Sequence, residues 1–251
     1  MKRVLITAGG NGIGRAIGQA FDDAGYQVWV TDVDQAALGD CPENWQRDVV
    51  NAADEGQMAD LFGKVADTWG GLDAICANAG IAGPTAKVED VNLADWRACV
   101  SVNLEGAFLA AKYGGAMLKD RKGAIVLTSS TAGIYGYPNR APYASAKWAI
   151  IGLMKTLAME WGPDGVRANA ICPGAVEGPR MAGVMEREAL AKGTTPQHIY
   201  DGYASGVSMR SLVTAQDIAD MAVFLCAPQS RMVSGQVIAV DGHTENPDPK
   251  V

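Results

Sequence analysis

Short apolar runs alternate with longer amphipathic stretches along most of the chain, and this alternation restricts the fold more than any other feature. Six runs have the length and composition of buried strands, at residues 4–7, 28–31, 74–77, 124–128, 168–171 and 237–240. Continuous apolar runs are typical of strands that helices cover on both faces. Their alternation with helices predicts an α/β fold with a doubly wound parallel sheet, in which ligands bind beyond the carboxyl ends of the strands.

The stretches between these runs carry helix signals, and two segments lie outside the pattern. Three predicted helices each follow an N-cap residue: 52–68 after Asn51, 93–118 after Asn92, and 215–226 after Thr214. Residues 177–210 form a long polar connection, and we expect a helical lid over the substrate because connections of this length are usually functional. No linker interrupts the pattern, so residues 1–251 are predicted to form a single domain with a tail at 242–251.

Composition and charge narrow the function classes. The 251 residues are 48% hydrophobic and 20% charged, with a net charge of -7 that would repel a nucleic-acid backbone. No apolar run is long enough to cross a bilayer or to form the core of an export signal. The five cysteines are far apart, without a Cys-x-x-Cys pair or a histidine cluster, which predicts reduced thiols and no metal site. We therefore expect a soluble cytoplasmic protein that binds neither nucleic acid nor a membrane.

A glycine-rich turn follows the first apolar run and precedes a helical pattern. Glycines allow positive φ angles and let the backbone approach a pyrophosphate, which would rest on the N-terminal amides of the helix. An isolated motif of this kind is explained equally well by an ordinary tight turn. The candidate cofactor contacts in the turn are Gly9, Asn11, Gly12, Ile13 and Gly14.

Acidic and polar residues end the neighbouring strands. Asp32 follows the glycine turn at close to the spacing of about 20 residues at which an acidic residue meets the adenosine ribose. A carboxylate there accepts hydrogen bonds from the ribose hydroxyls and repels a 2'-phosphate, which favours NAD over NADP; alternatively, Asp32 caps the following turn. Further candidates are Asp48 and Val49 for the adenine, at the end of a short additional strand, and Asn78, Ala79 and Gly80 for the ribose.

The pair Tyr143 and Lys147 is the candidate catalytic site. The two residues are four apart in an alanine-rich helical stretch, so their side chains share one face. Removing a proton from an alcohol requires a base, and a neighbouring ammonium favours the phenolate form of a tyrosine. A surface helix pair would explain Tyr-x-x-x-Lys on its own, but Ser130 precedes it at a strand end, where a hydroxyl could hold the substrate oxygen. Ser129 and Thr131 compete for that role.

These motifs, in this order, resemble the short-chain dehydrogenase/reductase family of Rossmann-fold enzymes. The resemblance extends over about residues 2–242 and includes the glycine turn, Asn-Ala-Gly, the serine and Tyr-x-x-x-Lys. It implies that Ser130, Tyr143 and Lys147 are catalytic. It also implies that Asn103 holds a water that links the lysine to solvent as a proton relay.

The same resemblance extends to the nicotinamide end of the cofactor site. It implies that Pro173, Gly174 and Val176 flank the nicotinamide, with the Val176 backbone facing the carboxamide. Many family members have a threonine at the position of Gly178, so the anchoring of the carboxamide differs here. Relatives that use NADP often carry a basic residue where this chain has Asn11, which agrees with the prediction of NAD.

The substrate is less constrained than the cofactor. Arg180 and His198 in the lid segment and Tyr137 before the tyrosine motif are candidates for substrate contact. They indicate a small polar substrate such as a sugar, polyol, hydroxy acid or sulfonate. These side chains could instead simply face water.

The sequence therefore predicts an NAD-dependent oxidoreductase that acts on a secondary alcohol or carbonyl. The resemblance also implies a homotetramer in which the helices at 92–119 and 141–161 pair with a neighbour. One alternative is a 3-oxoacyl-[acyl-carrier-protein] reductase that uses NADPH, although the acidic chain lacks an evident basic docking patch. A second alternative is a nucleotide-binding protein without enzymatic activity, which usually lacks the catalytic tyrosine or lysine.

Overall fold

A computed structural model describes residues 1–246, apart from the side chains of Arg180, Arg187 and Ala191. The predicted tail at 242–251 therefore lies partly outside the described residues. Seven strands form one sheet in the order β3-β2-β1-β4-β5-β6-β7, and every neighbouring pair is parallel. The strands are β1 (Lys2–Thr7), β2 (Tyr26–Asp32), β3 (Gln46–Val49), β4 (Ala74–Ala77), β5 (Ala124–Thr128), β6 (Arg167–Pro173) and β7 (Val237–Val240). The predicted doubly wound sheet is confirmed.

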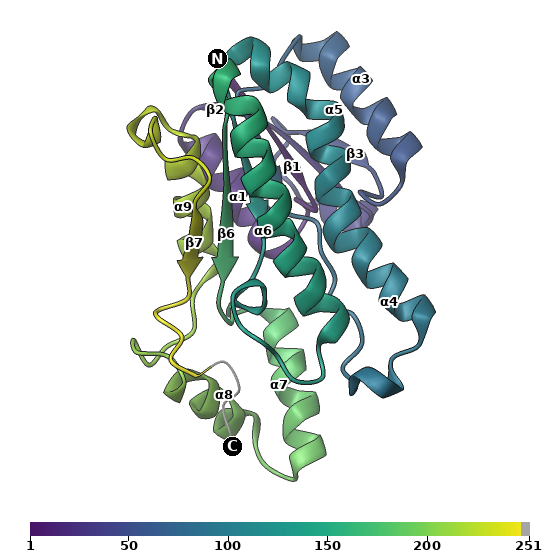
Figure 1. Cartoon of the computed structure of the whole chain (residues 1–251), viewed down its shortest axis with the longest axis vertical. Helices are drawn as coiled ribbons and strands as arrows, with labels where there is room; N and C mark the ends of the chain where they lie inside the picture. The colour runs from purple at the N-terminus through teal and green to yellow at the C-terminus, as the bar shows by residue number, and fades with distance from the viewer. Residues whose placement is uncertain (247–251) are drawn as a thin grey trace.

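Helices cover both faces of the sheet, as Figure 1 shows, with α5 and α6 in front of the strands. One core cluster joins the sheet to α3 (Glu55–Trp69), α5 (Gly106–Arg121) and α6 (Ala141–Trp161). A second cluster joins the opposite face to α1 (Gly12–Asp23) and α9 (Ala215–Cys226), while the short α2 (Gln35–Gly39) packs at the edge. Neighbouring strand residues alternate between the clusters because successive side chains point to opposite faces.

Two helix starts distinguish a correct sequence prediction from a wrong one. α9 begins after Thr214 as predicted, and Thr214 forms a capping box with Asp217. α3, in contrast, begins at Glu55 after the N-cap Asp54, so the predicted start at residue 52 is wrong. The Asn51 side chain accepts a hydrogen bond from Ala53 N at 3.1 Å and thus caps a turn that precedes the helix.

The predicted continuous helix at 93–118 is interrupted. It consists of α4 (Leu93–Val100), a π-helical turn (Ser101–Glu105) and α5. The apolar pattern continues through the turn, so it does not predict a break. Single π turns are rare and occur mostly at functional sites, and this one contains Asn103.

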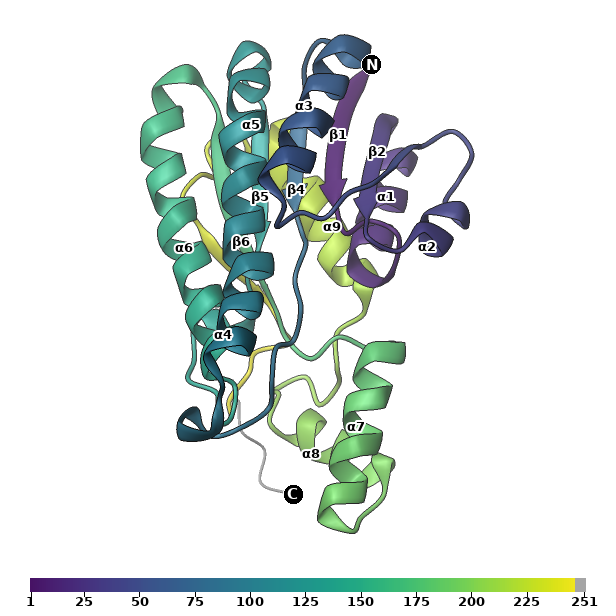
Figure 2. The same cartoon turned by 90° about the vertical axis from the view of Figure 1, so that its right-hand side faces the viewer.

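The predicted lid segment at 177–210 contains two helices, α7 (Pro179–Lys192) and α8 (Pro196–Ser205). They lie beyond the carboxyl ends of the strands, at the bottom of Figure 2. A parallel bridge between Val176 and Val213 joins the two ends of the segment, and an antiparallel bridge links Val207 to Thr244. These helices therefore adjoin the sheet edge at which doubly wound folds bind ligands.

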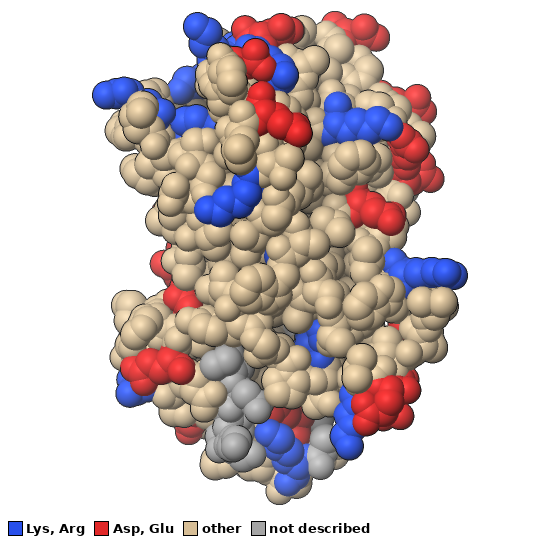
Figure 3. All heavy atoms as spheres, in the orientation of Figure 1, with Lys and Arg blue, Asp and Glu red and all other residues tan. Residues whose placement is uncertain are grey.

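Figure 3 shows Lys and Arg side chains at many places on the visible face, interspersed with Asp and Glu. All five cysteines are buried and free. Within residues 1–246, no helix is both long and apolar enough to span a membrane.

Two helical glycines allow a test of the packing between α5 and β4. A Cβ on Gly114 would lie 2.2 Å from Ile75 Cδ1, whereas a Cβ on Gly152 would meet no atom within 4 Å. We predict that Gly114→Ala lowers the free energy of unfolding by about 1–3 kcal/mol through overpacking. Gly152→Ala should raise it by about 0.5–1 kcal/mol because helix propensity improves. Urea unfolding of both variants measures the difference, and equal effects would contradict this packing.

Candidate active site

The glycine turn has the geometry that a bound pyrophosphate requires. A Cβ on Gly14 would lie 2.0 Å from the Ala8 carbonyl oxygen, so only glycine fits there. Gly12 has a φ of 51° and open space within 4 Å of a Cβ position. Asn11 is the N-cap of α1 but makes no side-chain cap bond, so no capping side chain satisfies the first amides of the helix. The turn thus combines close backbone approach with amides suited to an anion.

Asp32 lies beside the glycine turn at the end of β2. Its Oδ2 accepts from Gly10 N at 3.0 Å and its Oδ1 accepts from Asp34 N at 3.1 Å. The carboxylate therefore caps the local turn and also borders the cofactor turn, so the two interpretations of Asp32 are compatible. The nearby cations Arg15 and Arg47 donate to backbone carbonyls rather than to Asp32.

Both carboxylate oxygens of Asp48, the predicted adenine contact, already accept hydrogen bonds from the protein. Asp48 Oδ1 accepts from Lys64 Nζ at 2.6 Å, and Oδ2 accepts from Trp29 Nε1 at 2.8 Å. The side chain of the following Val49 is largely exposed. A carboxylate oxygen can accept more than one hydrogen bond, so a contact with adenine stays a prediction.

Asn78 and Ala79 join the ends of three strands. Thr7 Oγ1, at the end of β1, accepts hydrogen bonds from the amides of both residues at 3.0 and 3.1 Å. The Asn78 side chain donates to Ala8 O and accepts from Thr128 Oγ1 on β5. This network fixes the segment that lies between the glycine turn and the catalytic candidates.

Tyr143 and Lys147 of α6 lie near Asn103, which belongs to the π-helical turn Ser101–Glu105. Lys147 Nζ is 5.6 Å from the Tyr143 ring centroid and donates to the Thr128 carbonyl at 2.8 Å, and the lysine is buried. Asn103 is fully buried, and its Nδ2 donates to the carbonyls of Ile81 and Cys99. Its Oδ1 is buried without a hydrogen-bond partner among the described residues.

Gly80 lies where this asparagine and the lysine approach each other. A Cβ on Gly80 would be 2.7 Å from Asn103 Oδ1 and 3.2 Å from Lys147 Nζ. A larger residue at this position would collide with these two polar atoms, so glycine is required. An unsatisfied buried acceptor beside a buried ammonium is suited to a bridging water, because buried polar groups normally have a partner.

The structure distinguishes the three hydroxyls at the end of β5. Ser129 is buried and donates to the Lys147 carbonyl at 2.7 Å, and Thr131 pairs with the Tyr137 hydroxyl at 3.0 Å. Ser130 is half-buried, and its Oγ accepts from Ala132 N, which leaves its own hydroxyl hydrogen able to donate. Ser130 is therefore the hydroxyl best placed to meet a substrate oxygen.

The segment after β6 is held in position by backbone bonds. Pro173 ends the strand, and Gly174 N donates to the Val240 carbonyl at 3.0 Å. A Cβ on Gly174 would lie 2.9 Å from Asp241 Cβ, which explains the glycine. Val176 pairs with Val213, and Gly178, with φ of 141°, precedes α7. The backbone beside the predicted nicotinamide site is thus fixed on both sides.

The three predicted substrate contacts differ in their placement. Tyr137 is half-buried next to Thr131, and burial raises the pKa of its hydroxyl. His198 is exposed on α8, and its imidazole makes no hydrogen bond or ion pair with the described residues. The side chain of Arg180 lies outside the described residues. Of the three, Tyr137 alone is supported by a described contact near the catalytic candidates.

Comparison with known proteins decides the family. A family model described as enoyl-(acyl carrier protein) reductase matches residues 7–243, nearly the whole chain. The chain belongs to the short-chain dehydrogenase/reductase family. It is therefore an oxidoreductase of the kind that acts on CH–OH groups.

Several dehydrogenases and reductases of this family are similar over almost their full length. The 2-(S)-hydroxypropyl-CoM dehydrogenase 3 of Xanthobacter autotrophicus is 36% identical and covers 95% of this chain and 94% of its own. A 3-oxoacyl-[acyl-carrier-protein] reductase of Thermotoga maritima is 32% identical, with 96% of both chains covered. The structure of NAD+-bound xylitol dehydrogenase superposes with a TM-score of 0.91 at 27% identity, covering 96% and 98% of the two chains.

The sequence predictions missed one residue of this short-chain dehydrogenase/reductase site. The guanidinium carbon of Arg140 lies 5.0 Å from the Tyr143 ring centroid. Arg140 comes just before the Tyr-x-x-x-Lys motif, and only its conformation in the folded chain brings it over the ring.

We predict that Tyr143→Phe removes most of the activity and leaves cofactor binding intact. Loss of the proton acceptor should lower turnover roughly 100- to 10,000-fold. Tyr113→Phe is the matched control, because Tyr113 donates to Glu55 on the surface of the helix layer. Steady-state rates and fluorescence titration of NADH measure both effects. An active Tyr143→Phe enzyme would contradict the assignment.

The two serines make a second comparison. Ser130→Ala should lower turnover roughly 100-fold, because a donor to the substrate oxygen is lost. Each variant should also lower the free energy of unfolding by about 1 kcal/mol, because Ser130 loses its cap bond from Ala132 N and Ser129 loses a buried hydrogen bond. Turnover rates therefore distinguish the two roles, and a larger loss of turnover in Ser129→Ala than in Ser130→Ala would contradict the assignment.

Proposed function

We propose that the chain is an NAD-dependent oxidoreductase that transfers a hydride between nicotinamide and a secondary alcohol or carbonyl of a small polar substrate. The buried Lys147 ammonium beside the Tyr143 ring carries this proposal. A surface helix pair, the alternative for this motif, would not bury the lysine. Both residues are retained, which argues against a nucleotide-binding protein without activity.

The residues of the site have distinct tasks in the proposed reaction. Bound NAD supplies the carbon that accepts the hydride. Ser130 donates a hydrogen bond to the substrate oxygen, and Tyr143 in its phenolate form takes the hydroxyl proton as the hydride leaves. The Lys147 ammonium favours that phenolate. Asn103 Oδ1, an acceptor without a described partner, is suited to hold a water that passes protons from the lysine to solvent.

Asp32 supports NAD as the cofactor. Its carboxylate ends β2 next to Gly10, and the two arginines near it donate to carbonyls of the α2 region instead of forming a phosphate clamp. Gly9, Gly12 and Gly14 would hold the pyrophosphate, with Asn11 and Ile13 beside it. Asn78, Ala79 and Gly80 would line the ribose, and Pro173, Gly174 and Val176 the nicotinamide.

The substrate class is proposed from the polar surroundings of Tyr143. Tyr137 and the cation Arg140 lie near it, which favours a polar or charged substrate over an apolar one. Relatives are named for hydroxycyclohexanecarboxylate as well as for borneol, so the family accepts both kinds. The NADPH-dependent 3-oxoacyl-[acyl-carrier-protein] reductase stays the second candidate because such an enzyme is 32% identical.

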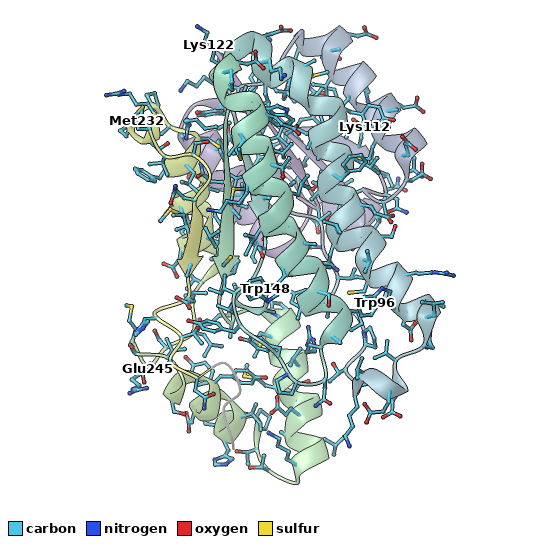
Figure 4. The ribbon with its side chains drawn as sticks, in the orientation of Figure 1. Trp96, Lys112, Lys122, Trp148, Met232 and Glu245 are labelled. Atoms are coloured by element: carbon cyan, nitrogen blue, oxygen red, sulfur yellow. The ribbon has the colours of Figure 1, made fainter. Side chains whose placement is uncertain are left out.

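We also propose a cytoplasmic homotetramer built on α4, α5 and α6. Exposed apolar side chains on α5 and α6 include Phe108, Trp148 and Met159. Figure 4 shows Trp148 of α6 and Trp96 of α4 on this side of the molecule. Large exposed apolar side chains on these helices support an interface there.

The cofactor proposal predicts a change of preference in Asp32→Asn. The variant keeps the shape of the side chain but removes the charge that repels a 2'-phosphate. We expect its NADPH affinity relative to NADH to rise at least about tenfold, which corresponds to about 1.4 kcal/mol. Asp23→Asn, at the exposed end of α1, loses the same charge and is the control. Fluorescence titration with both nucleotides measures the ratio, and a wild-type preference for NADPH would refute the proposal.

The assembly proposal predicts that Phe108→Glu weakens association. A charge buried in an interface loses hydration without a partner, so the particle mass should fall toward that of a smaller oligomer. Met232→Glu, an exposed methionine outside these helices, is the control. Light scattering after size exclusion measures the mass, and a monomeric wild-type chain would refute the proposal.

A further inference from the structure

The N-terminus of α6 carries a residue that is unfavourable for the helix. Arg140 occupies the N-cap position, where Ser, Thr, Asp and Asn are preferred, and it makes no side-chain cap bond. Its positive charge lies at the positive end of the dipole of a 21-residue helix. A position that breaks two local rules at a candidate active site indicates a functional demand on that side chain.

The guanidinium lacks the partners that its charge requires. Nη2 donates to the Ala82 carbonyl at 3.2 Å, but Nε is buried without a hydrogen-bond partner. Arg140 forms no ion pair with any carboxylate in residues 1–246. Arg140 is half-buried, and a buried polar atom such as its Nε normally has a partner, so this cation is suited to an anion that the chain does not supply.

The charge lies over the ring of the proposed proton acceptor. The Arg140 guanidinium carbon is 5.0 Å from the ring centroid of Tyr143, the proposed proton acceptor. It is also near enough to Tyr137 and Tyr203 to oppose the rise that burial causes in the pKa of each hydroxyl. The guanidinium is therefore near the ring of Tyr143 and also near the lid helix α8 that carries Tyr203.

The two acidic side chains of this region, Asp241 and Glu188, have other partners, and Asp241 accepts from the amides of His243 and Thr244. Glu188 on α7 accepts from Tyr203 at 3.1 Å and from Lys192 at 2.7 Å. Its charge is therefore balanced by a lysine one turn away, and Arg140 keeps an unpaired positive charge.

The backbone holds Arg140 in place before any ligand binds. Asn139 has a φ of 60°, and its carbonyl accepts from Ala86 N at 3.0 Å. The Arg140 carbonyl accepts from Ala144 N in the first turn of α6. These bonds fix the backbone, and the bond from Nη2 to the Ala82 carbonyl orients the guanidinium, so less freedom is lost when a small ligand binds.

We propose that Arg140 binds a carboxylate or sulfonate group of the substrate, so that the enzyme acts on short hydroxy acids or hydroxysulfonates. A guanidinium matches the planar arrangement of two such oxygens and forms two parallel hydrogen bonds with them. Because the guanidinium is so near the Tyr143 ring, only a few bonds can separate the anionic group from the alcohol carbon. This inference rests on the proposed dehydrogenase function and narrows its substrate class.

Matched substrates distinguish anion binding from a positioning role of Arg140. The first pair is 3-hydroxybutanoate and its neutral amide, and the second is 2-hydroxypropane-1-sulfonate and its sulfonamide, each with NAD. We expect the wild-type enzyme to prefer at least one of the anions. In Arg140→Gln, the ratio of kcat/KM for that anion to kcat/KM for its neutral partner should fall at least tenfold. Arg140→Lys should recover part of the loss, and Arg231→Gln, an exposed arginine far along the chain, is the control.

Equal losses for anionic and neutral substrates would overturn the proposal, because they would mean that Arg140 only positions Tyr143. The absence of any preference for an anion in the wild-type enzyme would overturn it as well.

A binding experiment separates this inference from the proposed function. Isothermal titration of butanoate or ethanesulfonate into the enzyme with saturating NAD should show binding to the wild type and at least tenfold weaker binding to Arg140→Gln. Both proteins should bind NAD equally. If NAD binds and neutral alcohols are oxidised but neither anion binds, the anion site is refuted and the proposed function stands. If NAD does not bind at all, the proposed function fails and the anion site with it.

Discussion

The connection between the end of β5 and α6 is the constraint on which the rest of the site depends. Ser129 donates to the Lys147 carbonyl, and Lys147 Nζ donates back to the carbonyl of Thr128. A buried ammonium without such a partner would be strongly destabilising, so the two bonds hold the helix against the strand end. Tyr143 lies one turn earlier on the same face of α6. Its hydroxyl is therefore positioned by an interaction that serves stability and chemistry together.

The sheet order brings the cofactor half of the site next to this connection. β1 and β4 are neighbours at the centre of the sheet, where the strand order reverses and a crevice opens beyond their carboxyl ends. Thr7 accepts the amides of Asn78 and Ala79 across that reversal, and Thr128 donates to the Asn78 side chain. The glycine turn, the Asn-Ala-Gly segment and the β5 end thus form one hydrogen-bonded rim.

Sequence reasoning worked where one local pattern determined the outcome and failed where the tertiary structure chose between local alternatives. The apolar runs predicted the strands because a buried parallel strand admits little else. Asn51 and Asp54 are both good N-caps, and packing selected the second. Nothing in the apolar pattern marks the π turn Ser101–Glu105. The choice between Ser129 and Ser130 likewise required knowledge of which hydroxyl meets α6 and which faces outward.

The sequence does not indicate a role for Arg140, because that role depends on the lack of a carboxylate partner in the folded chain. Two cations flank the Tyr143 ring, with Lys147 Nζ at 5.6 Å and the Arg140 guanidinium at 5.0 Å. The lysine is buried against a strand-end carbonyl, whereas the arginine has one carbonyl bond, an unsatisfied Nε and no carboxylate. This asymmetry divides their tasks, because the lysine charge acts on the tyrosine and the arginine charge is left for a ligand. Arg140 is an unfavourable N-cap residue and lowers the stability of α6. A functional site can retain such a residue because its side chain is needed to bind the anion.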